Sequence, residues 1–145
     1  MYFERLNFTT IDKNQLTKDI AMDLTQLEQQ TVLIIDKQLE AYNNRDIEAF
    51  AATYHDDVEI HTFPGGLQYK GKDTLIKHYG EKFASLVYLN ATSLSRIVNG
   101  NYLVDKERAR SASCDENIID NDVVVIASYQ VENGLIKRVS FMREQ

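Results

Sequence analysis

Glycine and proline are distributed unevenly along this chain of 145 residues. All six glycines and the only proline lie at or after Pro64. Glycine and proline interrupt helices and form tight turns, so the first part of the chain is expected to be helical and the second to contain the turns of a sheet. The distribution predicts an α+β fold in which early helices cover one face of a late antiparallel sheet.

Apolar residues recur at helical spacing between Asp12, which can cap a helix, and Tyr42. This stretch exceeds the usual length of a globular helix, so we expect either a break near residues 27–31 or an N-terminal arm that packs on a partner chain. The sequence Asn43–Asp46 is expected to end it and to cap a second helix over residues 47–54. A third helix is expected over residues 72–83.

Strand periodicity begins with Val58, Ile60 and Thr62, which alternate with polar residues before the turn at residues 63–66. Four more strands are predicted over residues 89–98, 101–113, 122–131 and 135–142. Asn-Gly pairs at 99–100 and 133–134 mark hairpins, because both residues tolerate the positive φ of a type I′ turn. The predicted order is α-α-β-α-β-β-β-β.

The composition restricts the class of protein. A chain of this length holds one sizeable core, and its single cysteine, Cys114, cannot form an internal disulfide, as is typical of cytoplasmic proteins. No signal-peptide pattern or membrane-length apolar run is seen, and a net charge of −6 disfavours binding to phosphate backbones. We therefore expect a cytoplasmic protein that binds neither nucleic acid nor membrane.

Several short motifs occur in a specific order. They are Tyr42–Phe50, Tyr54–Ile60, Phe63–Gly66, Gly71–Asp73, Arg96–Tyr102 and Val131–Ile136. Together they resemble the nuclear transport factor two-like superfamily, in particular its SnoaL-like and ketosteroid-isomerase-like branch. The resemblance covers residues 27–145 and leaves residues 1–26 as an N-terminal helical extension. It implies a cone-shaped, strongly bent antiparallel sheet packed on three helices, a pocket at the open end, and often a homodimer formed through the sheet.

Ketosteroid isomerase moves a proton with an aspartate base, while a tyrosine and a protonated aspartate hold the oxyanion. By element position, the resemblance puts the base at or beside Thr62, the tyrosine near Gln38 and the second aspartate near Ala127. None of these residue types is kept, so isomerisation of a steroid by that set of groups is not expected. His61 lies one residue from the base position. A register shift of one residue moves every side chain of a strand to the other face of the sheet, so it decides whether His61 or Thr62 faces the pocket. Regular alternation places His61 with Glu59 on the outer face.

The predicted hairpin at residues 99–100 brings Arg96 and Asp105 together. They are directly opposite if Gly100 and Asn101 form the loop, and diagonal if the loop is one residue earlier. The same face is expected to carry Leu94, Val98, Leu103 and Glu107. Arg96 and Asp105 form a structural cross-strand pair in one interpretation; in the other, Asp105 or Glu107 acts as an acid or base on a bound ligand. The even-numbered Lys106, Arg108 and Arg110 are interpreted as a solvated face.

These patterns predict a domain that binds a small apolar or carbonyl-bearing ligand, forms a homodimer, and requires neither a cofactor nor a metal. The candidate acid–base residues are His61, Asp105 and Tyr54. The candidate ligand contacts are Thr62, Arg96, Glu107 and Gln38. An enzyme of this kind would be an isomerase or a lyase; the alternative is a non-catalytic ligand-binding or dimerisation domain.

Overall fold

The computed structural model describes residues 23–144, and the predicted α+β class is confirmed. The predicted extension over residues 1–26 lies outside the described residues except for its last few positions. The helices are α2 (Gln26–Asn43), α3 (Ile47–Ala51) and α4 (Lys72–Ser85). The strands are β1 (Tyr54–Thr62), β2 (Gly66–Lys70), β3 (Tyr88–Asn99), β4 (Tyr102–Ala112), β5 (Asn121–Glu132) and β6 (Leu135–Arg143).

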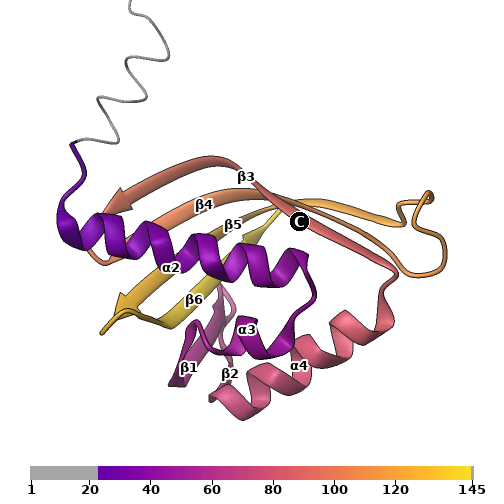
Figure 1. Ribbon diagram of the computed structural model, residues 1–145, viewed down its shortest axis with the longest axis horizontal. Coiled ribbons are helices and arrows are strands. Elements are labelled where there is room, and N and C mark those ends of the chain that lie inside the picture. The colour runs from indigo at the N-terminus through magenta and orange to yellow at the C-terminus, as the bar shows by residue number, and fades with distance from the viewer. Residues whose placement is uncertain (1–22, 145) are drawn as a thin grey trace, which may run out of the picture.

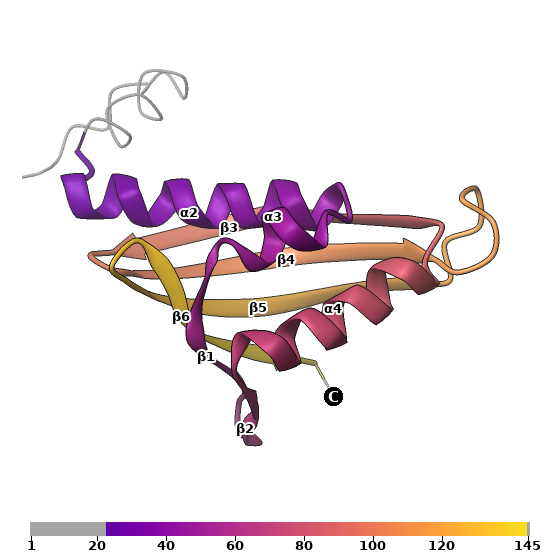
Figure 2. The ribbon, with the colours of Figure 1, turned by 60° about the horizontal axis from the view of Figure 1, so that its bottom comes forward.

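The strands form one curved sheet in the order β2-β1-β6-β5-β4-β3 (Figure 1). Neighbouring strands are antiparallel except β1 and β6, which are parallel, so the sheet is mixed rather than purely antiparallel. Helix α2 packs against β3 and β4, whereas α4 packs against β1 and β2 (Figure 2). The helices therefore cover the inner face of the sheet and leave its outer face uncovered.

Helix α2 begins with a capping box. The Thr25 hydroxyl accepts a hydrogen bond from the Glu28 amide at 3.1 Å, and the Glu28 carboxylate accepts one from the Thr25 amide at 3.0 Å. The helix thus starts just before the window in which a break was expected. Its first turns are fixed to the β3–β4 hairpin, because Glu28 also accepts from the Gly100 amide and Thr31 donates to the Gly100 carbonyl.

Two predicted boundaries were wrong. Helix α3 ends at Ala51 rather than at residue 54, and Tyr54 begins β1. The chain leaves the helix there because the Thr53 carbonyl accepts a hydrogen bond from the Ile136 amide of β6. Strand β2 was not predicted at all; within residues 23–144 it is a short edge strand that pairs with β1 alone.

The hairpins confirm one predicted turn and revise another. Asn133 and Gly134 both have positive φ, at 51° and 76°, as the predicted type I′ turn requires. In the β3–β4 hairpin the loop is Gly100–Asn101, because Asn99 pairs with Tyr102. Farther along β3 a register shift leaves Leu94 without a partner, and Leu94 is 53% exposed instead of lying on the inner face as predicted.

The core lies between the helices and the inner sheet face. Its fully buried members include Ile35, Phe50, Val58, Leu75 and Val139, which come from every layer of the fold. Within residues 23–144, none of the helices is long and apolar enough to span a bilayer.

Candidate functional site

A cavity of about 120 Å³ lies between α2, α4 and the inner face of the sheet. A cavity of about 150 Å³ holds a benzene molecule, so this one is at the lower limit of what a single small ring needs. Its lining combines apolar side chains with a few polar ones. The polar and aromatic side chains are Gln38, Tyr42, Tyr79, Lys82, Glu107, Arg110, Ser111, Asn121, Tyr129, Phe141 and Arg143.

A second cavity of about 210 Å³ adjoins the first. The two share the side chains of Tyr79, Lys82 and Phe141. The second cavity lies on the side of these side chains that faces α4 and β1.

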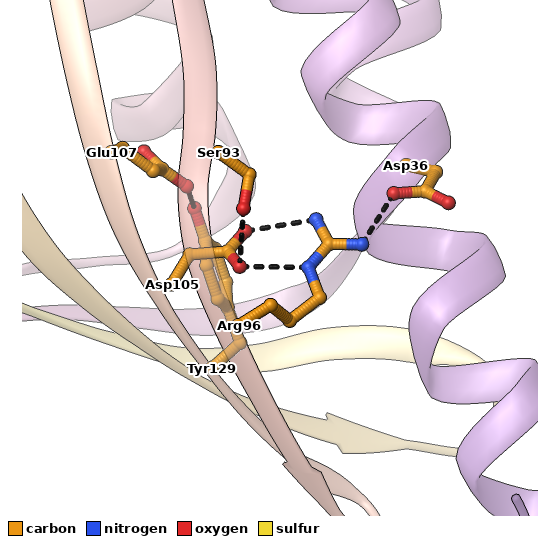
Figure 3. Close-up of polar contacts among 6 residues, drawn as sticks. All are labelled: Asp36, Ser93, Arg96, Asp105, Glu107 and Tyr129. Atoms are coloured by element: carbon orange, nitrogen blue, oxygen red, sulfur yellow. Dashed lines mark hydrogen bonds and ion pairs between the residues drawn. The ribbon is translucent and has the colours of Figure 1, made fainter. Parts of the chain in front are cut away.

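Glu107 is the buried acid of the first cavity. Leu103, Asp105 and Glu107 alternate along β4 and are buried, while the residues between them are exposed. Only 7% of Glu107 is exposed, and its Oε1 accepts a hydrogen bond from the Tyr129 hydroxyl at 3.0 Å (Figure 3). The carboxyl group is therefore held in place at the cavity wall from the next strand, β5.

Burial raises the pKa of Glu107 from 4.5 to about 7. The negative charge of Asp105 adds to this rise, whereas the hydrogen bond from Tyr129 and the positive charge of Arg96 oppose it. A carboxyl group with this pKa is present in both protonation states near neutral pH. It can therefore give or take a proton there, as a general acid–base group must.

Two phenols and an amide complete the polar wall. Burial raises the pKa of Tyr42 to about 12 and raises that of Tyr79 further, so both remain protonated hydrogen-bond donors. The Gln38 amide donates to the Tyr54 hydroxyl at 3.0 Å, and its buried Oε1 accepts no hydrogen bond from the described residues. Gln38 thus offers a polar atom at the cavity, while Tyr54, 1% exposed, lies outside the lining.

Asp105 and Arg96 form an extensively bonded ion pair (Figure 3). They are directly opposite in the β3–β4 register, and the guanidinium donates to both oxygens of Asp105, at 2.7 and 2.9 Å. Asp105 also accepts from Ser93, and Arg96 donates to Asp36 of α2 at 2.6 Å. Neither Asp105 nor Arg96 lines the cavity. These contacts agree with the interpretation of Arg96 and Asp105 as a structural pair, because Arg96 connects Asp36 of α2 to Asp105 of the sheet.

His61 and Thr62 also lie outside the cavity lining. His61 Nε2 is 3.0 Å from Glu59 Oε1, and Arg138 donates to the other Glu59 oxygen at 3.2 Å. The Thr62 hydroxyl accepts from Gln68 of β2. Of the predicted site residues, therefore, Glu107 and Gln38 line the cavity. Tyr54 does not line it but is hydrogen-bonded to Gln38.

Apart from Gln38 and Glu107, the lining residues were not among the predicted site residues; they include Tyr79, Lys82, Tyr129 and Arg143. Tyr129 lies on the same face of β5 as the buried Val125, Ala127 and Val131. The two-residue period of the strand therefore indicates that Tyr129 points inward. Lys82 and Arg143 carry no such signal, because their placement depends on the packing of α4 and on the end of β6. In the part of the chain that the structure describes, no group of three metal-ligating side chains occurs.

Comparison with known proteins gives one family match and many matches of fold. A model of the SnoaL-like domain family matches residues 35–139. A cystatin fold protein from Novosphingobium aromaticivorans superposes with a TM-score of 0.70 and 21% identity, covering 78% of this chain and 97% of its own. Comparison with curated proteins finds no significant match.

Two further similar structures are of proteins that are named for an enzymatic activity. A protein from Kribbella flavida, provisionally assigned as a ketosteroid isomerase, has a TM-score of 0.67 and 19% identity over 81% of this chain and 80% of its own. An LEH-like epoxide hydrolase from M. tuberculosis has a TM-score of 0.67 and 13% identity over 81% and 84% of the two chains. At these identities the likeness establishes the fold, and the activity must be argued from the residues.

Proposed function

Because the chain belongs to the SnoaL-like domain family, we propose that it binds a small apolar carbonyl compound in the cavity of α2, α4 and the sheet, and that Glu107 exchanges a proton with it. The observation that carries this proposal is the buried Glu107 carboxyl, fixed by Tyr129 and with a pKa of about 7. Acid–base catalysis is most effective when the pKa of the group lies near the working pH.

The proposed reaction is an isomerisation that conserves all atoms. The carboxylate form of Glu107 removes a proton from the carbon beside the carbonyl. The C–H electron pair becomes a C=C bond, and the π pair of the C=O bond moves onto the carbonyl oxygen. The phenol of Tyr42 or Tyr79 donates a hydrogen bond to the resulting enolate, as an oxyanion requires. Protonated Glu107 then returns the proton to another carbon of the conjugated system.

Acetophenone tests this proposal, because it has one ring, one carbonyl and exchangeable methyl protons. We expect the protein to accelerate incorporation of deuterium from D₂O into the methyl group, followed by NMR. Glu107→Gln should reduce the accelerated rate by at least about 100-fold, the usual contribution of a general acid–base group. Glu59→Gln removes a carboxyl from the outer face and is the matched control, expected to change the rate little.

A non-catalytic ligand-binding domain is the alternative. Two positions that the ketosteroid isomerase resemblance assigned to catalysis favour it: Ala127 is fully buried and has no functional group, and the Thr62 hydroxyl is bonded to Gln68. Saturable binding of acetophenone without accelerated deuterium exchange would support this alternative over proton transfer.

We also propose a homodimer formed through the outer sheet face. Exposed apolar side chains gather there on three adjacent strands, and Ile97 lies directly opposite Val104 in the β3–β4 register. The set consists of Ile97, Tyr102, Val104, Val124 and Ile126. An uncovered apolar patch of this kind is typical of a protein–protein contact.

We also propose that the protein is located in the cytoplasm. Its support is the exposed free thiol of Cys114. Such thiols persist where the glutathione and thioredoxin systems keep them reduced.

A further inference from the structure

Two exposed cations of the cavity lining have no carboxylate partner among residues 23–144. Lys82 comes from the last turn of α4, and Arg143 is the final residue of β6. Neither takes part in an ion pair with a described residue, whereas the other four arginines of the sheet do. Arg96, Arg108, Arg110 and Arg138 each lie within 4 Å of an aspartate or glutamate oxygen.

The strand register places Arg143 on the same sheet face as Glu107. Val125 of β5 is directly opposite Glu107 on one side and Arg143 on the other. Directly opposite residues point to the same face, and neighbouring strands lie about 4.8 Å apart. The backbones at Glu107 and Arg143 are therefore about 10 Å apart across the cavity floor, with an apolar valine between the acid and the cation.

Lys82 approaches the same space from the helix layer. Its ammonium nitrogen is 5.2 Å from the ring centre of Tyr42 and 5.9 Å from that of Tyr79. Burial and then the like charge of Arg143 lower the pKa of Lys82. Two exposed positive groups thus line one cavity, and an anion bound there would be attracted to both of them.

We propose that the ligand of this cavity is a small organic carboxylate, whose carboxylate group lies between Lys82 and Arg143 while its apolar body extends toward Glu107. This inference rests on the proposed function and specifies the charge of the ligand. The backbones at Glu107 and Arg143 lie about 10 Å apart, so their side chains enter the cavity from two different strands and can contact different ends of one small ligand. The protein's net charge of −6 repels anions elsewhere, so these cations would account for the selection of an anionic ligand.

Benzoate and its neutral analogue benzamide test the inference, because both carry a single ring and differ mainly in charge. Isothermal titration calorimetry at pH 7 should show benzoate binding about tenfold more tightly than benzamide, as expected for a hydrogen-bonded charged group. Lys82→Gln and Arg143→Gln should each weaken benzoate binding about tenfold and leave benzamide binding nearly unchanged. Retained benzamide binding would show that the variants still fold.

Lys106→Gln is the matched control, because it removes the same charge from the exposed outer face of β4. It should leave both affinities unchanged. Equal affinity for benzoate and benzamide, unaffected by Lys82→Gln and Arg143→Gln, would overturn the anion selectivity while leaving a binding cavity in place. Failure of the unmodified protein to bind either compound would contradict both this inference and the proposed binding function.

Discussion

Two buried carboxyl groups on the same face of β4 are stabilised in different ways. Asp105 accepts hydrogen bonds from Arg96 and Ser93, so its negative charge has direct partners. Glu107 has only the Tyr129 hydroxyl, and its pKa rises to about 7. A buried charge without a cationic partner favours its neutral form. The different partners of the two carboxyl groups therefore favour a structural role for Asp105 and make Glu107 the candidate for proton exchange.

The raised pKa of Glu107 predicts a pH-dependent cost in stability. Below pH 4.5 the group is protonated in both folded and unfolded chains; between pH 4.5 and about 7 only the folded chain keeps the proton, so stability falls as pH rises. Chemical denaturation of the protein and of Glu107→Gln should show the variant gaining up to about 3 kcal/mol relative to the parent across this range. A difference in unfolding free energy that is independent of pH would contradict the raised pKa.

Asp105→Asn tests the structural role of the ion pair. The substitution leaves Arg96 with a neutral partner in a buried setting, and we expect the free energy of unfolding to fall by about 3 kcal/mol. Asp122→Asn is the matched control, because Asp122 pairs with Arg108 at the exposed surface, where such pairs contribute less than about 1 kcal/mol. Equal losses for the two variants in urea denaturation would contradict this distinction.

Strand register accounts for the part of the site that could be predicted from sequence. The hairpin signal at residues 99–101 brought Arg96 and Asp105 together on the face of Glu107 in either of two registers. The structure has the register in which Arg96 is directly opposite Asp105, and it buries Glu107 on the same face as Asp105. Lys82 could not be found in this way, because strand register says nothing about a residue of α4. The contact between Gln38 and the cavity likewise depends on how α2 packs on the sheet.

At the scale of elements, α2 and the β3–β4 hairpin support each other. The helix begins with the Thr25 capping box, and Glu28 and Thr31 bond the amide and carbonyl of Gly100. The helix start thus fixes the far end of the hairpin as well as its own first turn. Helix α2 in turn supplies Gln38 and Tyr42 to the cavity.

Thr25→Ala should lower the free energy of unfolding by about 1 kcal/mol, the usual effect of losing a helix N-cap. Thermal and urea denaturation measure this effect directly. Gln30→Ala serves as the control within the same helix, because Gln30 is exposed and lies beyond the cap. A loss for Gln30→Ala as large as that for Thr25→Ala would argue against a specific contribution of the cap.

Helices and strands whose own sequence has a clear hydrophobic periodicity could be predicted. Those that are ordered by contacts with another element could not. The long strands and the Asn133–Gly134 turn follow from local sequence alone. Strand β2 has only five residues and alternates weakly, and it is ordered by pairing with β1. The end of α3 depends in the same way on the bond between Thr53 and Ile136 of β6.

At the scale of the whole molecule, the sheet has one face for the cavity and one that is uncovered. The helices occupy the inner face (Figure 2). The apolar side chains of the outer face therefore remain exposed in a single chain. The proposed homodimer would bury that patch without closing the cavity, because the two lie on opposite sides of the sheet.

Ile97→Lys should therefore convert a dimer to a monomer. Ile97 is 70% exposed in the outer patch, and a charge there would be desolvated in the interface. Sedimentation equilibrium gives the mass of each species. Ile118→Lys is the matched control, since Ile118 is 64% exposed on the β4–β5 loop, away from the sheet face. A monomeric parent, or a dimer that persists in Ile97→Lys, would contradict the proposed interface.

The ionisation of Glu107 is the property on which the proposed reaction depends most directly. An NMR titration of the ¹³C-labelled side-chain carboxyl groups measures it, with the Glu107 signal identified by its loss in Glu107→Gln. The account predicts that this signal titrates with a pKa of about 7. A midpoint near the ordinary value of 4.5 would contradict it, because the buried carboxyl group would then lack the raised pKa that places it in both protonation states near neutral pH.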